Sequence, residues 1–224
     1  ESLKANLEAL KFKPDSVELI DHYILECTKE NIEQSKNRFF VEGDPQAILV
    51  VEFLRDSKEE IVELAKEMEN LMRSKNLGYH FPIVWGEDTN KVWNLRKAGL
   101  GLLSNIPGDA KAVAVIEDTA VDVNDLPDFI EDFNAVLKER NLSCVHYAHA
   151  ATGELHLRPI IDLKTKEGTA LFRTIATDIA HLVKKYKGSL SGEHGDGRLR
   201  GEFIPLMLGE EIYQMFIQVK NTWD

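Results

Sequence analysis

Cysteine is scarce in this sequence, and other features that would fix its class are missing. Cys27 and Cys144 are the only cysteines among 224 residues, and neither belongs to a CxxC pair or a thiolate zinc pattern. We therefore expect two reduced, buried thiols, as in cytoplasmic proteins. No apolar run approaches the roughly 18 residues that cross a bilayer, and we find no signal peptide.

Positive charge is also in short supply, which excludes one class of partner. Lys and Arg number 27 against 38 Asp and Glu, so the formal net charge is −11. Non-specific nucleic-acid binding needs clustered cations, and the sequence does not supply them. Apolar residues make up 43% and charged residues 29%, which is an ordinary composition for a globular domain with ample core material.

The length and the two ends of the sequence indicate a piece of a longer polypeptide. A length of 224 residues suits one large domain or two small ones. The sequence opens on ESLKANLEAL without a Met and closes on QVKNTWD in a helical pattern that lacks a cap. We expect residues 1–224 to form one domain of that polypeptide.

Hydrophobic periodicity and turn signals predict alternating helices and strands. Helices are expected over residues 17–34, 57–76, 87–106, 124–140, 169–188 and 209–223, and strands over 47–53, 80–86, 111–118, 143–150 and 154–163. Strand pairs joined by helices favour an α+β fold, with helices packed on an antiparallel sheet. A GxGxxG motif between a strand and a helix is missing, so a Rossmann unit is not indicated.

The segment HAATGELH predicts half of a metal site. His149 and His156 flank a short Gly-containing turn, so they can point to the same face of a hairpin. His146 precedes His149 by three residues on the same predicted strand, so it should face the other way. Two imidazoles need at least one further ligand, and ordinary surface or core histidines are the alternative reading.

The segment SGEHGDGRLRGEF offers the missing groups. Gly192, Gly195 and Gly197 allow the backbone to turn sharply around Glu193 and His194. Glu193 can act as the third ligand, and His194 suits a general base because imidazole titrates near physiological pH. A plain turn is the alternative.

Three cations can hold an anionic substrate beside such a site. Arg158 follows His156 by two and should share its face, while Arg96 and Lys111 lie in separate segments. Arg suits a carboxylate through its planar fork. Solvated surface charge is the alternative for each. Arg198 and Arg200 can pair with acidic residues of a neighbouring domain.

Together these segments resemble a known family. SGEHGDGRLRGEF resembles the signature near the end of the FAD-linked oxidase C-terminal domain, found in D-lactate dehydrogenases, the glycolate oxidase D subunit and D-2-hydroxyglutarate dehydrogenases. HAATGELHLRP resembles the family's hairpin HxGDGNLH, and VEGDPQAILVVEF, LRKAG and KAVAVIEDTAV resemble other segments of it. The resemblance spans nearly the whole chain. It is strongest with bacterial fusion proteins in which an FAD-binding domain precedes this region and an iron–sulfur domain follows it.

The resemblance implies a fold and a set of roles. The fold would be a large antiparallel sheet flanked by helices, ferredoxin-like in its duplicated halves, that caps an FAD bound mainly by another domain. A D-2-hydroxy acid, 2-hydroxyglutarate- or lactate-like, would be oxidised with hydride passing to flavin N5. The implied roles are metal ligands (zinc, manganese or iron) for His149, His156 and Glu193, base for His194, and substrate contacts for Arg96, Lys111 and Arg158. A cytoplasmic location follows, with peripheral attachment to the inner membrane as a variant.

Some residues depart from the family's pattern. The hairpin lacks the GDG core, Leu100 stands where some members have Thr, and Arg158 stands where some have Asn. An added cation favours a dicarboxylate or a larger anion as substrate. Two other functions remain open: the cap of a metal-free FAD-linked alcohol or phenol oxidase, and a non-catalytic α+β binding module. For the dehydrogenase too, we expect the fragment alone to be inactive, because half of the active site belongs to the missing flavin domain.

Overall fold

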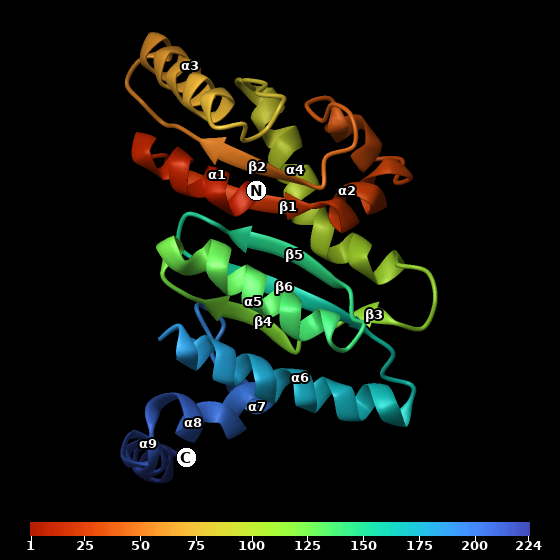
Figure 1. Ribbon diagram of the computed structural model, residues 1–224, viewed down its shortest axis with the longest axis vertical. Helices are drawn as coiled ribbons and strands as arrows, with labels where there is room; N and C mark the ends of the chain where they lie inside the picture. The colour runs from red at the N-terminus through yellow and green to blue at the C-terminus, as the bar shows by residue number, and fades with distance from the viewer.

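The computed structural model describes residues 1–224, and its strands form one antiparallel sheet (Figure 1). The strands are β1 (Ser16–Asp21), β2 (Ala47–Glu52), β3 (Lys111–Ala112), β4 (Ile116–Ala120), β5 (Cys144–His149) and β6 (Glu154–Ile161). Their order is β2-β1-β5-β6-β3, and β4 also pairs with β6. Every pair is antiparallel, so the first strand of the chain lies inside the sheet beside a strand from its second half.

Helices flank this sheet and extend below it to the C-terminus. They are α1 (Ser2–Ala9), α2 (His22–Lys29), α3 (Lys58–Ser74), α4 (Glu87–Leu102), α5 (Leu126–Lys138), α6 (Lys166–Lys185), α7 (Gly197–Arg200), α8 (Ile204–Leu208) and α9 (Glu210–Trp223). The predicted α+β class is confirmed. None of these helices has the combined length and apolarity needed to span a membrane.

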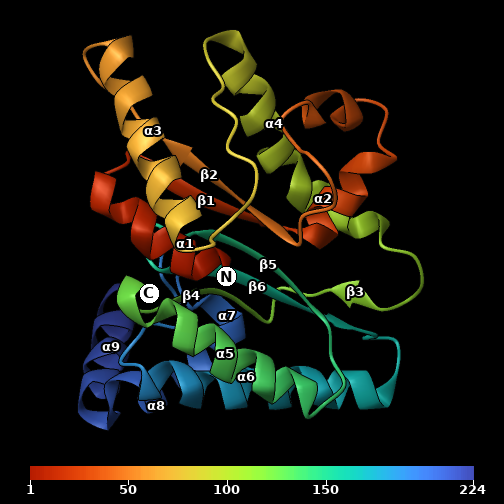
Figure 2. The same cartoon turned by 45° about the horizontal axis from the view of Figure 1, so that its top comes forward.

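The two faces of the sheet carry different cores. Along β6, Leu155 and Leu157 join a large apolar cluster with Phe129 and Phe133 of α5, and this cluster covers one face (Figure 1). A smaller cluster lies on the opposite face, where α2 and α4 pack (Figure 2). His156 alternates with the leucines and therefore belongs to that second face. The helices of the second face leave part of it open, and the polar groups described below lie there.

The expected helix over residues 17–34 was partly wrong. Residues 16–21 form β1, and the helix begins at His22, where the side chain of Asp21 accepts a hydrogen bond from the N–H of Ile24 at 3.2 Å. β1 pairs with β2 and β5 and is buried on both faces, Glu18 and Asp21 included. Because both faces are buried, the sequence lacks the regular apolar–polar alternation that marks a half-buried strand.

Two further predicted strands differ from the structure. Residues 80–86 pair with no strand, and two of their aromatic rings lie under cationic side chains of α3: Arg73 over Phe81 at 4.9 Å and Lys58 over Trp85 at 4.7 Å. Residues 111–118 are divided between β3 and β4. Ser57 caps the N-terminus of α3, since its hydroxyl accepts a hydrogen bond from the N–H of Glu60 at 3.2 Å.

Candidate metal centre

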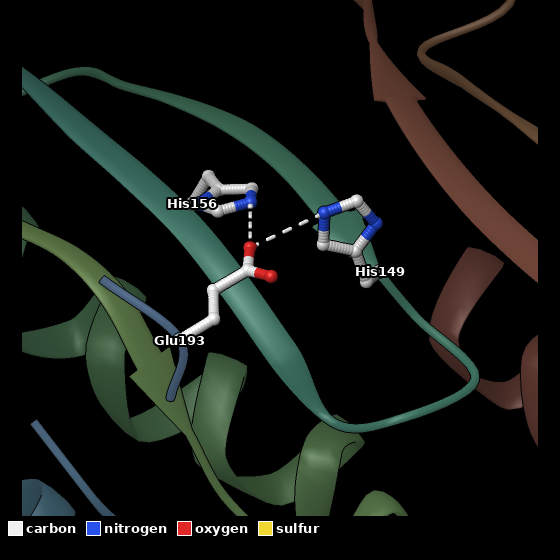
Figure 3. A group of neighbouring side chains, drawn as sticks. All are labelled: His149, His156 and Glu193. Carbon is white, nitrogen blue, oxygen red and sulfur yellow. Dashed lines mark ion pairs between the residues drawn. The ribbon is translucent and has the colours of Figure 1, made fainter. Parts of the chain in front are cut away.

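Three side chains from distant parts of the chain converge on the open part of the sheet (Figure 3). His149 ends β5, His156 lies in β6, and Glu193 belongs to the loop after α6. Oε1 of Glu193 lies 3.4 Å from Nε2 of His149 and 3.4 Å from Nε2 of His156. These ligand atoms all lie within 4.8 Å of one another, so they form a set that can hold a divalent cation.

The strand register explains why both imidazoles face the same way. Across the β5–β6 hairpin, His149 pairs with Glu154 and Tyr147 pairs with His156. Since residues two apart on a strand share a face, His149 and His156 are diagonal neighbours on one face. Their ring centroids lie 5.2 Å apart. The three side chains thus meet, as the sequence pattern implies, while metal binding stays a prediction.

The spacing and the charges fit a bound cation. Ligand atoms about 2.0–2.1 Å from a tetrahedral zinc lie about 3.3 to 3.4 Å apart, which agrees with the separations from Glu193. The ion-pair contacts of Glu193 are all with imidazoles, namely those of His149, His156 and His194. No Lys or Arg of the chain therefore occupies the position that a metal would take beside this carboxylate.

The surroundings shift the pKa values of the two hairpin imidazoles in opposite directions. A hydrogen bond from Nδ1 to Oε1 of Glu18, at 2.7 Å, is the main cause that raises the pKa of His149. Burial lowers the pKa of His156 to about 4, and the nearby charges of His149 and Arg96 add to this effect. His156 is therefore neutral at physiological pH, which is the form that binds a metal.

Asp118 shapes the loop that carries Glu193. This fully buried residue has a φ of 83° at a bulge in β4. Its carboxylate accepts hydrogen bonds from the N–H groups of Glu193 at 2.8 Å and His194 at 3.1 Å, and from the Ser191 hydroxyl at 2.5 Å. Burial alone would raise the pKa of Asp118, but these donors hold it below its ordinary value. The loop is thereby fixed with Glu193 facing the hairpin.

Arg200 also holds this loop in place, through hydrogen bonds to Asp118 and to the loop backbone. Its Nη2 donates to Oδ2 of Asp118 at 3.0 Å and to the carbonyl of Gly195 at 2.7 Å, and its Nη1 donates to the carbonyl of Glu117. The expectation that Arg200 pairs with a neighbouring domain was wrong. α7 brings this side chain beneath the β4 bulge, where the buried charge of Asp118 is its partner.

A protonated carboxyl group fills the space beneath the loop. A Cβ on Gly192 would lie 1.6 Å from Oε2 of Glu154, so a larger residue would require the loop or the Glu154 side chain to move. Burial raises the pKa of Glu154 to about 8, and the neighbouring charges of Asp118 and Glu193 contribute. Glu154 therefore supports the loop at neutral pH without adding a negative charge beside the ligands.

Arg96, a predicted substrate-binding cation, shares a carboxylate partner with His149. It reaches over the sheet from α4 with its guanidinium 5.0 Å from the ring centre of Tyr147. Nη2 and Nε lie 2.9 and 3.2 Å from Oε2 of Glu18, the same carboxylate that contacts His149. Nη1 makes no hydrogen bond, so it can contact a ligand.

Arg158 shares the face of His156, as predicted, but its charge is already matched. Glu117 lies opposite His156 in the β4–β6 register and forms an ion pair with Nη2 of Arg158. Nε of Arg158 donates to the hydroxyl of Tyr147 at 3.2 Å. A substrate anion would therefore compete with Glu117 for this guanidinium.

The structure does not bring Lys111 to the three ligands. Lys111 pairs with Ile161 at the far end of β6 from His156. Its ammonium group donates to the backbone carbonyls of Ser104 at 3.3 Å and Ile106 at 2.5 Å. Its role as a substrate contact stays a prediction.

His194 lies at the exposed rim of the centre. Its side chain is about half exposed, and Nε2 lies 3.7 Å from Oε1 of Glu193. Nδ1 lies 3.9 Å from an oxygen of Glu117 and 3.9 Å from one of Asp118. The ring stacks on that of His156 with centroids 5.5 Å apart. His194 can therefore reach a small molecule held by the ligand set.

Several residues of the site were not predicted from the sequence as parts of it. Glu18, Asp118 and Arg200 are buried and charged, and each contacts a loop or ligand of the centre. The sequence gives one indication for Glu18: it is the acidic residue within the otherwise apolar segment VELI. A helix over residues 17–34 does not predict that Glu18 lies beside His149, because this contact depends on strand pairing. His146 faces α5 and lies near Phe133 and Asn134, as the alternation predicted.

Comparison with known proteins identifies the family. The family described as FAD linked oxidases, C-terminal domain, matches residues 3–224. The chain belongs to this family. The expected relationship, drawn from the hairpin and the glycine-rich loop, is thereby confirmed for an FAD-linked oxidase C-terminal domain.

Similar proteins are much longer than this FAD-linked oxidase domain. A D-2-hydroxyglutarate dehydrogenase of Pseudomonas putida is 33% identical over 220 residues, which cover 95% of the chain and 22% of that protein. A D-2-hydroxyglutarate dehydrogenase of Escherichia coli is 32% identical, covering 93% of the chain and 21% of that protein. Glycolate oxidase subunit GlcD of Bacillus subtilis is 21% identical, covering 80% of the chain and 37% of that protein. The chain thus spans about a fifth of the length of the two dehydrogenases.

Proposed function

We propose that this chain is the substrate-side domain of a flavin-dependent dehydrogenase that oxidises a D-2-hydroxy acid to the 2-oxo acid. The observation that carries the proposal is the convergence of His149, His156 and Glu193 from three separate segments. The relatives named D-2-hydroxyglutarate dehydrogenase favour a 2-hydroxy dicarboxylate as the substrate class. A cationic group near the ligands, Arg96, suits the carboxylates of such a molecule.

His149, His156 and Glu193 would hold the divalent metal. Two imidazole nitrogens and one carboxylate oxygen suit zinc, manganese or iron(II). Bound there, the metal would act as a Lewis acid that lowers the pKa of the substrate hydroxyl. The neutral state of His156 at physiological pH means that binding does not have to displace a proton from this residue.

His194 is the proposed general base. Its Nδ1 lies on the side of Glu117 and Asp118, whereas its Nε2 faces the ligand set. The proton can therefore reside on Nδ1 while Nε2 accepts the proton of the substrate hydroxyl. The Asp118 carboxylate fixes the His194 backbone, so the ring is held near the ligands even though it is exposed.

Arg96 is the proposed first contact for a substrate carboxylate, because its Nη1 is unbonded and its other two nitrogens are held. Arg158 would contribute a second contact if the anion shares it with Glu117. Lys111 would have to leave two backbone carbonyls to take part. These contacts would orient C2 of the acid relative to His194.

FAD is the proposed redox cofactor, and it would accept the hydride from C2 of the acid. The FAD linked oxidases family gives the reason for this cofactor, and the length of the relatives allows further domains, an iron–sulfur domain among them. We propose that such domains are the partners of this chain, and that the enzyme is cytoplasmic or attached at the inner membrane surface.

Replacing His194 by Asn in the intact polypeptide tests the base. We expect kcat for dye reduction with D-2-hydroxy acids to fall about 10²- to 10⁴-fold, the usual contribution of a general base. His181→Asn, on the exposed side of α6, is the matched control and should leave kcat unchanged. Turnover by the His194→Asn protein equal to that of the wild type would remove His194 as the base.

Metal analysis of the purified protein separates this proposal from a metal-free oxidase. We expect one bound divalent ion in the wild type and a large loss in a His156→Ala variant. Full activity after complete removal of the metal would contradict the proposal.

A further inference from the structure

Glu18 is a buried carboxylate that contacts both a candidate metal ligand and the candidate substrate-binding arginine. It lies on β1 directly opposite His149 in the sheet. Its two oxygens are divided between two partners: Oε1 lies 2.7 Å from Nδ1 of His149, and Oε2 lies 2.9 and 3.2 Å from Nη2 and Nε of Arg96. The side chain is 8% exposed, so water does not replace these partners.

We propose that Glu18 is a positioning residue that sets the tautomer of His149 for metal binding and at the same time fixes Arg96 for the substrate. This inference rests on the proposed function, because it assumes that His149 is a metal ligand and that Arg96 contacts the substrate.

The tautomer follows from the chemistry of the carboxylate. An ionised carboxylate only accepts hydrogen bonds, so the 2.7 Å contact requires a proton on Nδ1 of His149. In the neutral ring Nε2 then carries the lone pair, and Nε2 is the atom that faces Glu193. Carboxylates that accept from the second nitrogen of a ligating histidine fix the ring and increase its basicity.

The position of Arg96 follows from the same group. Two of its nitrogens converge on one oxygen of Glu18, and the plane of the guanidinium lies near the Tyr147 ring, which leaves Nη1 unbonded. The positive charge of Arg96 also balances the buried charge of Glu18. The candidate metal ligand His149 and the candidate substrate contact Arg96 are therefore both positioned by Glu18.

Glu18→Gln tests the proposal because it keeps the volume and removes the charge. Arg96 should capture the amide oxygen, so that the amide NH₂ faces Nδ1 of His149 and favours the tautomer with its proton on Nε2. We expect Zn²⁺ affinity in the intact, metal-stripped polypeptide to fall about 10- to 100-fold, as for other groups behind metal ligands. Glu52→Gln, exposed on β2, is the matched control and should bind Zn²⁺ like the wild type.

The double variant Glu18→Gln with Arg96→Met distinguishes an effect on the tautomer of His149 from a general loss of folded structure. Without the guanidinium, the amide oxygen is free to turn toward Nδ1 of His149. We therefore expect the double variant to bind Zn²⁺ more tightly than Glu18→Gln alone. An equal or weaker affinity would overturn the tautomer argument, because damage to the fold would accumulate.

Arg96→Met alone decides the question if Glu18→Gln does not fold. It leaves Glu18 with His149 as its partner, so Zn²⁺ affinity should equal or exceed that of the wild type while KM for the acid rises. A tenfold loss of Zn²⁺ affinity would overturn the proposal.

The His156→Ala variant distinguishes the two levels of failure. If the wild type and His156→Ala bind Zn²⁺ equally weakly, the proposed function itself fails. If His156→Ala loses Zn²⁺ but Glu18→Gln keeps full affinity, only the role of Glu18 is wrong.

Discussion

At the scale of single residues, the centre is a set of ionisable groups whose pKa values have been moved apart by burial. Burial lowers the pKa of His156 to about 4 and raises that of Glu154 to about 8, so both are neutral near pH 7. Asp118 keeps its charge because hydrogen-bond donors surround it. The carboxylates that keep a negative charge have cationic partners, since Asp118 pairs with Arg200, Glu18 with Arg96 and Glu117 with Arg158, whereas Glu193 lies at the exposed edge.

Glu154→Gln should change how stability depends on pH. In the unfolded chain the carboxyl group ionises near its ordinary value of 4.5, and in the folded chain near 8. The unfolded state therefore loses its proton first as pH rises, and this residue lowers the stability of the folded protein between about pH 5 and pH 8.

With EDTA present, the Tm of the wild type should fall relative to that of Glu154→Gln when pH is raised from about 5 to about 8. Parallel Tm curves for the two proteins over this range would show that Glu154 is not protonated in the folded state.

Gly192→Ala should displace the loop from the hairpin. A methyl group at this position overlaps Oε2 of Glu154 at 1.6 Å, so either the loop or Glu154 must move. We expect at least a tenfold loss of Zn²⁺ affinity, on the order of that for removing groups behind metal ligands. Gly201→Ala meets no atom within 4 Å and serves as the control. Wild-type affinity in Gly192→Ala would show that the loop does not depend on this close contact.

At the scale of elements, the centre joins a hairpin, a bulged strand and a loop, and these differ in how far the sequence predicts them. The β5–β6 hairpin follows from alternation and the turn at Gly153, whose φ is 79°. The glycine-rich loop was also expected to turn around Glu193. Both depend on residues close together in the sequence.

The rest of the site depends on pairings that a single sequence does not reveal. Glu18 reaches His149 because β1 pairs with β5 across 131 residues, and Asp118 faces the loop because β4 is bulged at that residue. The position of Lys111 depends on the division of residues 111–118 into two strands. Local patterns contain no information about strand order, so these contacts were not predicted.

Arg200→Met should destabilise the protein because it leaves the charge of Asp118 buried without its partner. Removal of one member of a buried ion pair costs about 3–5 kcal/mol, which urea unfolding at neutral pH can measure. Arg198→Met, at an exposed position two residues earlier, should change stability by less than about 0.5 kcal/mol. Equal urea midpoints for the two variants would show that the ion pair between Arg200 and Asp118 does not stabilise the fold.

At the scale of the whole molecule, the sheet separates a mainly apolar face from a face that carries the site. The larger core lies against α5 and α6, whereas the smaller core lies with α2 and α4 beside the ligands. Stability and ligand binding therefore depend mainly on different sides of the same strands (Figure 2).

Phe129→Ala tests this separation. Phe129 is fully buried in the larger core, so its truncation should cost about 3–5 kcal/mol of stability in urea unfolding. Zn²⁺ affinity measured well below the unfolding midpoint should stay within about threefold of the wild type, because the change lies across the sheet. A large loss of Zn²⁺ affinity in the still-folded variant would show that the two faces are coupled.

The position of β1 inside the sheet also has a consequence for synthesis of the chain on the ribosome. β1 is made before β5, since His149, which faces Glu18 in the neighbouring strand, follows Glu18 by 131 residues. At about 5–20 residues per second, β1 waits on the order of ten seconds for that neighbour. During this time it has only β2 beside it, and an isolated two-stranded hairpin is marginal in water. One edge of β1 would therefore stay unpaired in the nascent chain until the second half emerges.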